Sequence, residues 1–152
     1  DLLIEGEIDL ILSPARPARF DPGQGPIVRL FPDSRAADRN YFRQTGLFPP
    51  QHLILLRRPV WESAPWIAAS LFSAFEKAER RFLGNLKENP FATPWFETEL
   101  DETIALMGEN FHPQGIAANR AALEIFAQEA HRSGVAGRLV SIEELFAEFL
   151  RA

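Results

Sequence analysis

Apolar residues recur at helical spacing through most of the second half of the chain. From Ser63 onward they return every three or four positions through Phe82, with charged residues on the opposite face. Ser63 is the predicted N-cap of this helix, and Pro65 is tolerated in its first turn. Further helices are predicted over 94–107, over 116–132 and from the capping box at 141–144 onward.

The first half of the chain has short apolar runs separated by breaks. Strands are predicted over 8–12, 27–31 and 53–56. The run 53–56 is apolar throughout and ends at Pro59, so we expect a central strand covered on both faces. Asp33 predicts the start of a helix over 34–45 that Gly46 ends.

Strands mostly before residue 60 and long helices after it predict an α/β fold. Three short strands cannot complete a sheet that needs cover on both faces. We therefore expect most of the sheet to lie outside this sequence. Because the chain opens at Asp1 within an apolar run, we interpret it as part of a longer protein. Trp66, Trp95 and Phe75 are expected in the core, as are Leu123 and Phe126.

The amino-acid composition excludes several classes of protein and of functional site. The 152 residues are 46% hydrophobic and 24% charged, which is typical of globular proteins. The net charge of −5 argues against nucleic acid as a partner. No apolar run approaches the roughly 20 residues of a membrane helix. The absence of cysteine excludes disulfides, thiolate metal sites and a cysteine nucleophile.

The basic residues are unevenly distributed. Residues 1–60 contain eight arginines and seven acidic residues, whereas residues 61–152 contain eight basic and fourteen acidic residues. All the basic residues of the first part are arginines, whose planar guanidinium suits carboxylates. If the ligand is an anion, the first part is therefore the better place to look for its binding site.

Histidine supplies the candidates for proton transfer near neutral pH. His52 lies at the mouth of a predicted strand, where α/β proteins gather their sites, and is the best candidate for a general acid or base. The alternative is a structural histidine bonded to backbone groups. His112 lies in a loop before a helix, where it either faces a ligand or is only exposed. His131 is expected to interact with a helix dipole.

Other candidates are arginines near the first predicted strand. Arg16 and Arg19 follow that strand and either clamp a carboxylate or remain solvated. Arg43 lies near the end of its helix, where it can also favour the dipole. No pair of histidines has the spacing of a metal site, so no metal is predicted.

Seven strings in this order resemble the C-terminal half of the 4,5-dihydroxyphthalate decarboxylase family. The strings are GEIDLILSPARP (6–17), RLFPD (29–33), YFRQTGLFP (41–49), His52, PWIAASLFSAFEKA (65–78), MGENFHPQGIAANR (107–120) and SIEELF (141–146). The resemblance covers nearly the whole chain. It is specific for the family and much less specific for substrate.

This resemblance implies a two-lobed fold of the type 2 periplasmic-binding-protein class, with a ligand cleft between lobes. It implies that residues 1–46 end the second lobe. Residues 47–152 would cross the hinge and form the C-terminal part of the first lobe. The missing N-terminal half of the same fold is then an expected partner. Ser13, Arg16, Thr45 and His52 would lie near the cleft.

The chain departs from the family pattern at three places. Pro50-Gln51 stands before His52 where the family usually has an apolar residue and Met. Residues 110–115 read NFHPQG where the family usually has Asp-x-x-Pro-Tyr-Gly. Pro17-Ala18 stands where two prolines are common. These differences concern the substrate more than the fold.

The first functional interpretation is a carbon–carbon lyase that decarboxylates a hydroxylated aromatic acid such as 4,5-dihydroxyphthalate without a cofactor. His52 would protonate the ring as general acid. Arg16 and Arg43 would hold carboxylates, and Ser13, Thr45 and His112 would be further substrate contacts. This interpretation implies a cytoplasmic protein.

The alternative is a non-catalytic solute-binding module for a small anionic or heteroaromatic ligand, with the same residues as ligand contacts. That interpretation implies a periplasmic protein. A third expectation is that this chain alone is inactive because its cleft is incomplete. The oligomeric state is not predicted.

Overall fold

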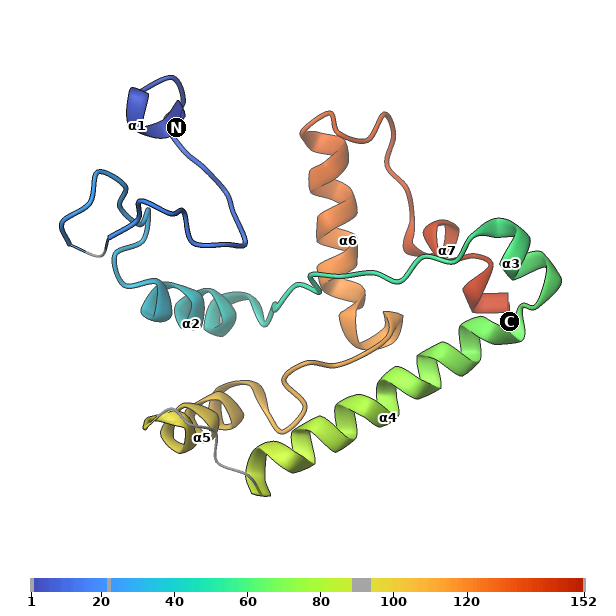
Figure 1. The fold of residues 1–152 in the computed structure, drawn as a ribbon. Coiled ribbons are helices and arrows are strands. Elements are labelled where there is room, and N and C mark those ends of the chain that lie inside the picture. The colour runs from blue at the N-terminus through green and yellow to red at the C-terminus, as the bar shows by residue number, and fades with distance from the viewer. Residues whose placement is uncertain (1, 22, 89–93, 152) are drawn as a thin grey trace. The chain divides into compact units, whose positions relative to one another are not determined.

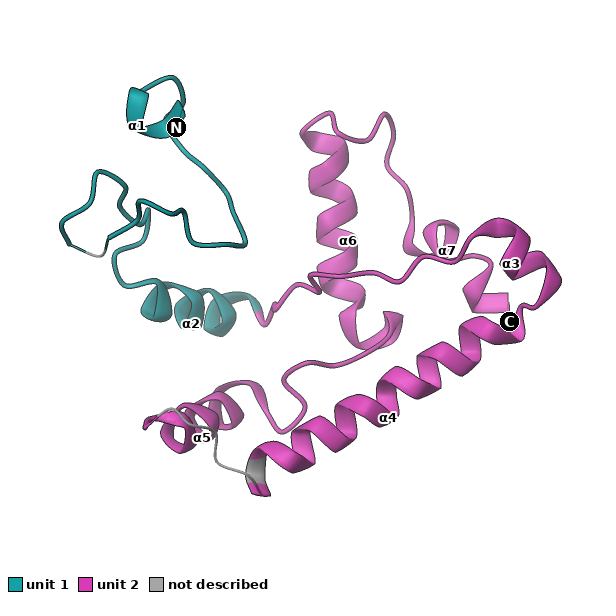
Figure 2. Cartoon of the chain, viewed as in Figure 1, with its two compact units in different colours: residues 1–45 teal, residues 46–152 magenta. Residues whose placement is uncertain are grey.

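The computed structural model describes residues 2–21, 23–88 and 94–151. The chain divides into two compact units, the first ending at Thr45 and the second beginning at Gly46 (Figure 2). The assignment of residues 1–46 and 47–152 to two lobes of a larger protein stays a prediction. The described helices are not long and apolar enough to cross a membrane.

The first unit contains helices α1 (Leu2–Glu5) and α2 (Ser34–Thr45) with an irregular segment between them (Figure 1). The carboxylate of Asp33 accepts a hydrogen bond from the amide of Ala36 at 2.9 Å, which is the N-cap that the sequence predicts. The predicted helix over 34–45 is confirmed. Its limits depend on local chemistry alone.

The second unit is built from helices joined by irregular segments. They are α3 (Arg58–Ser63), α4 (Trp66–Glu88), α5 (Phe96–Met107), α6 (Ile116–Arg132), α7 (Ile142–Leu145) and the short 3₁₀ helix η1 (Phe149–Arg151). Contacts join α3 to α4 and α6 to α7. Helix α4 is the longest element of the unit (Figure 1).

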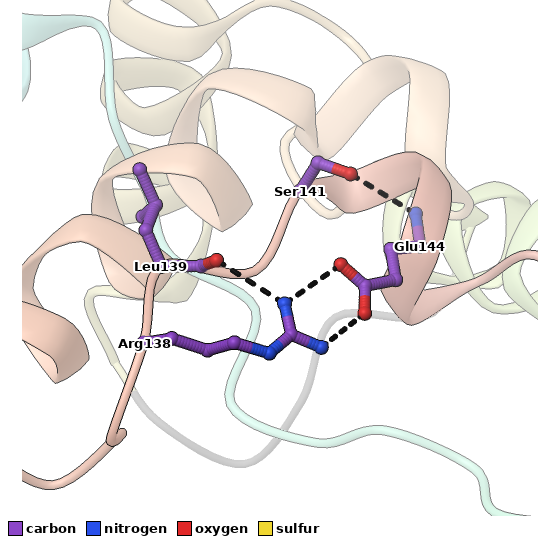
Figure 3. A network of polar contacts seen from close by, with 4 residues as sticks. All are labelled: Arg138, Leu139, Ser141 and Glu144. Carbon is purple, nitrogen blue, oxygen red and sulfur yellow. Dashed lines mark hydrogen bonds and ion pairs between the residues drawn. The ribbon is translucent and has the colours of Figure 1, made fainter.

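Local signals set the ends of two helices in this unit. The amide of Gly108 donates to the carbonyl of Ile104 at 2.8 Å and ends α5, as predicted. The hydroxyl of Ser141 accepts from the amide of Glu144 at 3.2 Å and caps α7 (Figure 3). Each of these caps satisfies a group that the helix itself leaves without a partner.

The start of α4 differs from the prediction. Pro59 does not end a strand but lies in the first turn of α3, where its missing amide costs nothing. Ser63 is the last residue of α3, and its hydroxyl donates to the carbonyl of Val60 at 3.2 Å. The long helix therefore begins at Trp66, and the prediction of Ser63 as its N-cap is wrong.

The α/β prediction is also wrong, and with it the type 2 periplasmic-binding-protein fold. None of the residues in 2–21, 23–88 and 94–151 forms a β-strand. The runs 8–12, 27–31 and 53–56 are irregular or extended, and no ladder joins them. A strand exists only when another segment takes up its backbone hydrogen bonds, and apolar composition alone cannot supply that segment.

The core is small. Among the described residues, the buried apolar side chains are Leu86, Ala122, Leu123 and Ile142. Ile142 of α7 is the most deeply buried, at 2% exposure. Leu123 was expected inside, but Phe126, three residues later, is 71% exposed. Trp66, Trp95 and Phe75 are exposed as well, so their prediction as core residues is wrong.

Candidate functional site

Two arginines meet one aromatic ring in the first unit. The guanidinium carbon of Arg16 lies 5.5 Å from the centre of the Phe20 ring, and that of Arg29 lies 5.4 Å from the same point. Both distances are within the range of cation–π attraction. Twelve residues lie between these arginines in sequence, so the folding of the loop brings them together.

Short-range contacts shape this loop. The hydroxyl of Ser13 donates to the carbonyl of Ala15 at 2.8 Å and accepts from its amide at 3.3 Å. The amide of Phe20 donates to the carbonyl of Pro17 at 3.0 Å. Ser13 thus shapes the start of the loop that carries Arg16, a role that sequence reasoning did not assign to it.

The return of the loop toward Phe20 depends on a close backbone approach at Gly25. Its amide donates to the carbonyl of Asp21 at 3.2 Å. A Cβ atom at this position would lie only 2.9 Å from the Asp21 nitrogen. Glycine therefore permits a turn that any larger residue would disturb.

The loop carries positive charge without acidic partners. Residues 14–31 contain three arginines and one aspartate, in a protein whose net charge is −5. Arg16, Arg19 and Arg29 are exposed, and no described carboxylate forms an ion pair with them. Their charges are therefore available to an anion.

Arg43 and Thr45, the other predicted contacts in this unit, lie in the last turn of α2. The hydroxyl of Thr45 donates to the carbonyl of Tyr41 at 2.8 Å, one helical turn earlier. Arg43 is exposed in a position that complements the helix dipole. No described contact joins either residue to Arg16, and their roles as substrate contacts stay predictions.

The loop containing His112 is held by α6 and α4. The side-chain amide of Asn119 donates to the carbonyls of Pro113 at 2.7 Å and Gly115 at 2.9 Å. Gly115 has φ of +88°, and a Cβ there would lie 3.0 Å from the Phe72 ring of α4. These contacts give Asn119 a structural role and hold the loop in one defined path.

His112 lies against two aromatic rings. Its ring centre is 5.4 Å from that of Phe48 and 5.2 Å from that of Phe111. The contact with Phe48 ties the segment after Gly46 to the loop 109–115. The imidazole remains exposed, so His112 can still face a ligand, as its sequence position suggested.

His52 lies four residues after Phe48, in the extended segment that leads to α3. Its side chain is exposed, and it takes part in no described hydrogen bond, ion pair or ring contact. The structural alternative, a histidine bonded to backbone groups, is therefore not what the structure shows. His131, by contrast, contacts the carbonyl of Ala136 at 3.3 Å through its ring nitrogen Nδ1.

Acidic side chains pair with Arg120 and Arg138 in the second unit. Arg138 pairs with Glu144 through both guanidinium branches and also donates to the Leu139 carbonyl (Figure 3). The Arg138 hydrogen bond lowers the pKa of Glu144. Arg120 similarly pairs with Glu143 at 2.7 Å and Glu124 at 3.2 Å. These arginines have structural partners, unlike those of the loop 14–31.

Two further features bear on ligands. A cavity of about 310 Å³ lies between α4, α5 and the loop residues Glu109 to Phe111, and its wall is mainly apolar. Within the described ranges, no cluster of three or more His, Asp or Glu side chains is arranged to hold a metal ion. The prediction of no metal rests on sequence spacing and stays a prediction.

Comparison with known proteins supports the resemblance read from the motifs. The chain is 31% identical to 4,5-dihydroxyphthalate decarboxylase of Comamonas testosteroni over 149 residues, which cover 96% of this chain. The resemblance to that decarboxylase is thus confirmed. The chain spans 45% of the length of this relative. No family model matches the chain.

Sequence reasoning missed Phe20, Arg29 and Phe48. Phe20 stands directly after Arg19 in the loop, and an aromatic residue among arginines is a signal for cation–π contact that could have been used. Arg29 and Phe48 are defined by contacts with residues far away in sequence. No pattern of neighbouring residues in the sequence predicts such contacts.

Proposed function

We propose that this chain forms part of an aromatic-acid decarboxylase. The observation that carries the proposal is its similarity, across nearly all of its residues, to 4,5-dihydroxyphthalate decarboxylase. Arg16 and Arg29, which form no ion pair with a described carboxylate, support the proposal, because an aromatic acid is an anion at neutral pH. Carboxylates are the groups that a guanidinium binds best.

The proposed reaction needs no cofactor. A general acid protonates the ring carbon that bears the carboxylate, and a ring hydroxyl stabilises the resulting cation. The carbon–carbon bond then breaks, its electron pair restores the aromatic ring, and carbon dioxide leaves. The acid is left deprotonated and recovers its proton from water.

His52 is the proposed general acid and Arg16 the proposed carboxylate ligand. The side chain of His52 is exposed and has no described structural partner, so a substrate can reach it. Arg16 has a cation–π partner but no carboxylate, so its hydrogen-bonding edge is available. Arg43, Ser13, Thr45 and His112 are proposed as further contacts of the substrate.

We also propose that activity requires polypeptide equivalent to the part of the relative that this chain does not span. The segment before α3 supports this proposal. Leu53, Ile54 and Leu55 are 55%, 58% and 87% exposed. The backbone groups of 51–56 make no hydrogen bond to another described residue. Apolar side chains and free backbone groups in one segment favour contact with a further polypeptide.

The proposal is tested by complementation. The uncovered part of the Comamonas testosteroni enzyme is combined with this chain, and carbon dioxide release from 4,5-dihydroxyphthalate is measured. We expect release from the combination and none from either part alone. His52→Ala should lower turnover at least about 100-fold while leaving binding of the aromatic acid nearly unchanged. His131→Ala is the matched control and should retain turnover.

Turnover that survives His52→Ala would contradict the assignment of the general acid. Binding of the aromatic acid without any release would instead favour the second candidate, a non-catalytic module for the same anion. The observation favouring that candidate is that Arg16 and Arg29 both lie beside the Phe20 ring and form no ion pair with a described carboxylate.

A further inference from the structure

The loop 14–31 provides more than one arginine for a carboxylate, because Arg16 and Arg29 both lie beside the ring of Phe20. Both guanidinium carbons lie within 5.5 Å of one ring centre, so their separation cannot exceed the sum of two such distances. The loop thus places two like charges near each other with an aromatic ring as their common partner. Two cations near one ring repel each other, and an anion that binds to both would relieve that repulsion.

A guanidinium packed on a ring keeps its hydrogen-bonding capacity. The contact with the ring uses no hydrogen bond, so the N–H donors of both guanidinium groups stay available to an anion. Ring contact also restricts the side chain before any ligand arrives, which lowers the entropy lost on binding. Phe20 therefore serves as a support that preorganises Arg16 and Arg29.

We propose that Arg16, Phe20 and Arg29 form a site for a benzene dicarboxylate, in which both arginines bind carboxylate oxygens. The choice of an aromatic dicarboxylate rests on the proposed function. The pairing of the two arginines rests on their geometry alone. Arg29 is thus a second substrate ligand that the comparison with the decarboxylase does not assign.

The two carboxylates explain why two arginines are needed. A monocarboxylate can satisfy one guanidinium fork and leaves the second charge uncompensated. An ortho dicarboxylate carries two negative charges on adjacent ring carbons and can neutralise both. The site should therefore prefer phthalate to benzoate by about tenfold or more, as expected from one additional charge-assisted hydrogen bond.

The test is phthalate binding to the 152-residue chain, measured by calorimetry with benzoate and inorganic phosphate as comparison ligands. Phthalate lacks the ring hydroxyls, so it reports binding without reaction. We expect Arg16→Gln and Arg29→Gln each to weaken phthalate binding about tenfold. Phe20→Leu keeps an apolar side chain but removes the ring, and it should weaken binding severalfold by releasing both arginines.

Arg19→Gln is the matched control, because Arg19 lies in the same loop, carries the same charge and makes no described contact with Phe20. It should change phthalate binding less than twofold. Equal losses for Arg19→Gln and Arg29→Gln would show only diffuse charge attraction and overturn the site. So would equal affinity for phthalate, benzoate and phosphate. All four positions are in an irregular, largely exposed loop, and circular dichroism verifies that each variant keeps its helices.

The proposed binding site and the proposed decarboxylase activity can be contradicted independently of each other. Arginine-dependent phthalate binding without carbon dioxide release in the complementation assay would support the site and contradict the decarboxylase. Carbon dioxide release whose KM is unchanged by Arg29→Gln would support the decarboxylase and overturn the site.

Discussion

The side-chain amide of Asn119 donates a hydrogen bond to the carbonyl oxygen of Pro113 across 2.7 Å. Asn119 is on the first turn of α6, and Pro113 belongs to the loop that carries His112. One side chain therefore fixes the path by which the chain enters a helix. The position of a candidate ligand residue depends on that bond.

Asn119→Ala should destabilise the chain by about 1–3 kcal/mol, because it removes two hydrogen bonds of about 0.5–1.5 kcal/mol each. The free energy of unfolding in urea measures the loss. Gln128→Ala, at an exposed position of the same helix, is the control and should be within about 0.5 kcal/mol of the unchanged chain. A loss in Asn119→Ala no greater than in the control would show that water replaces both bonds.

Two Gly→Ala substitutions should have opposite effects. Gly115 has φ of +88° and faces the Phe72 ring at 3.0 Å, so Gly115→Ala should cost about 1–3 kcal/mol. Gly84 lies within α4 with open space around it, so Gly84→Ala should stabilise by about 0.5–1 kcal/mol. Thermal unfolding should show a lower melting temperature for Gly115→Ala and a higher one for Gly84→Ala. Equal shifts would contradict the close packing of Gly115 on α4.

The contacts of His112 predict a spectroscopic change. Its imidazole protons should be displaced by ring currents from Phe48 and Phe111, whose centres lie 5.4 and 5.2 Å away. Phe48→Leu removes one ring but keeps an apolar side chain. Proton NMR should then show the His112 resonances moving toward ordinary positions while those of His131 stay unchanged. Unchanged His112 resonances would contradict the contact with Phe48.

The Arg138–Glu144 pair predicts a local dependence on pH. The Arg138 hydrogen bond holds the pKa of Glu144 below its ordinary value of 4.5. This pair therefore stabilises the folded chain fully above pH 4.5, and its contribution is lost as the pH falls through the lowered pKa. In Arg138→Gln, carboxyl-carbon NMR should show the pKa of Glu144 rising toward 4.5.

Arg132→Gln is the matched control for this titration. Arg132 pairs with Glu129 at 2.6 Å, so its substitution should raise the pKa of Glu129 and leave that of Glu144 unchanged. Both carboxyls are exposed, and high salt should weaken both effects because it screens exposed charges. An unaltered Glu144 titration in Arg138→Gln would contradict the pair.

Helices were predictable where their limits depend on neighbouring residues. Asp33 and Ser141 cap the helices that follow them, and Gly108 ends α5. Each of these signals acts over three or four residues. The start of α4 was predicted wrongly because Pro59 and Ser63 suit either a break or a helix, and in the structure both belong to the separate helix α3.

Strands were not predictable in the same way. The apolar run 53–56 favours an extended backbone, but a sheet also needs neighbours that composition cannot identify. Phe126 shows the same limit for burial, because its spacing matches Leu123 while its side chain is 71% exposed. At the candidate site, Arg16 could be found from its loop. Arg29 could be found only from the path of the chain back to Phe20.

The run 53–56, whose first three side chains are exposed, also bears on the tendency of the chain to self-associate. Steric zippers form from uncharged segments of six or seven residues with high β-propensity. Here the apolar window has four residues, with Pro49-Pro50 on one side and Arg57-Arg58-Pro59 on the other. Proline cannot donate to a growing cross-β ladder, and stacked arginines repel one another. We therefore expect the flanking residues to act as gatekeepers that oppose the extension of this apolar window into a fibril.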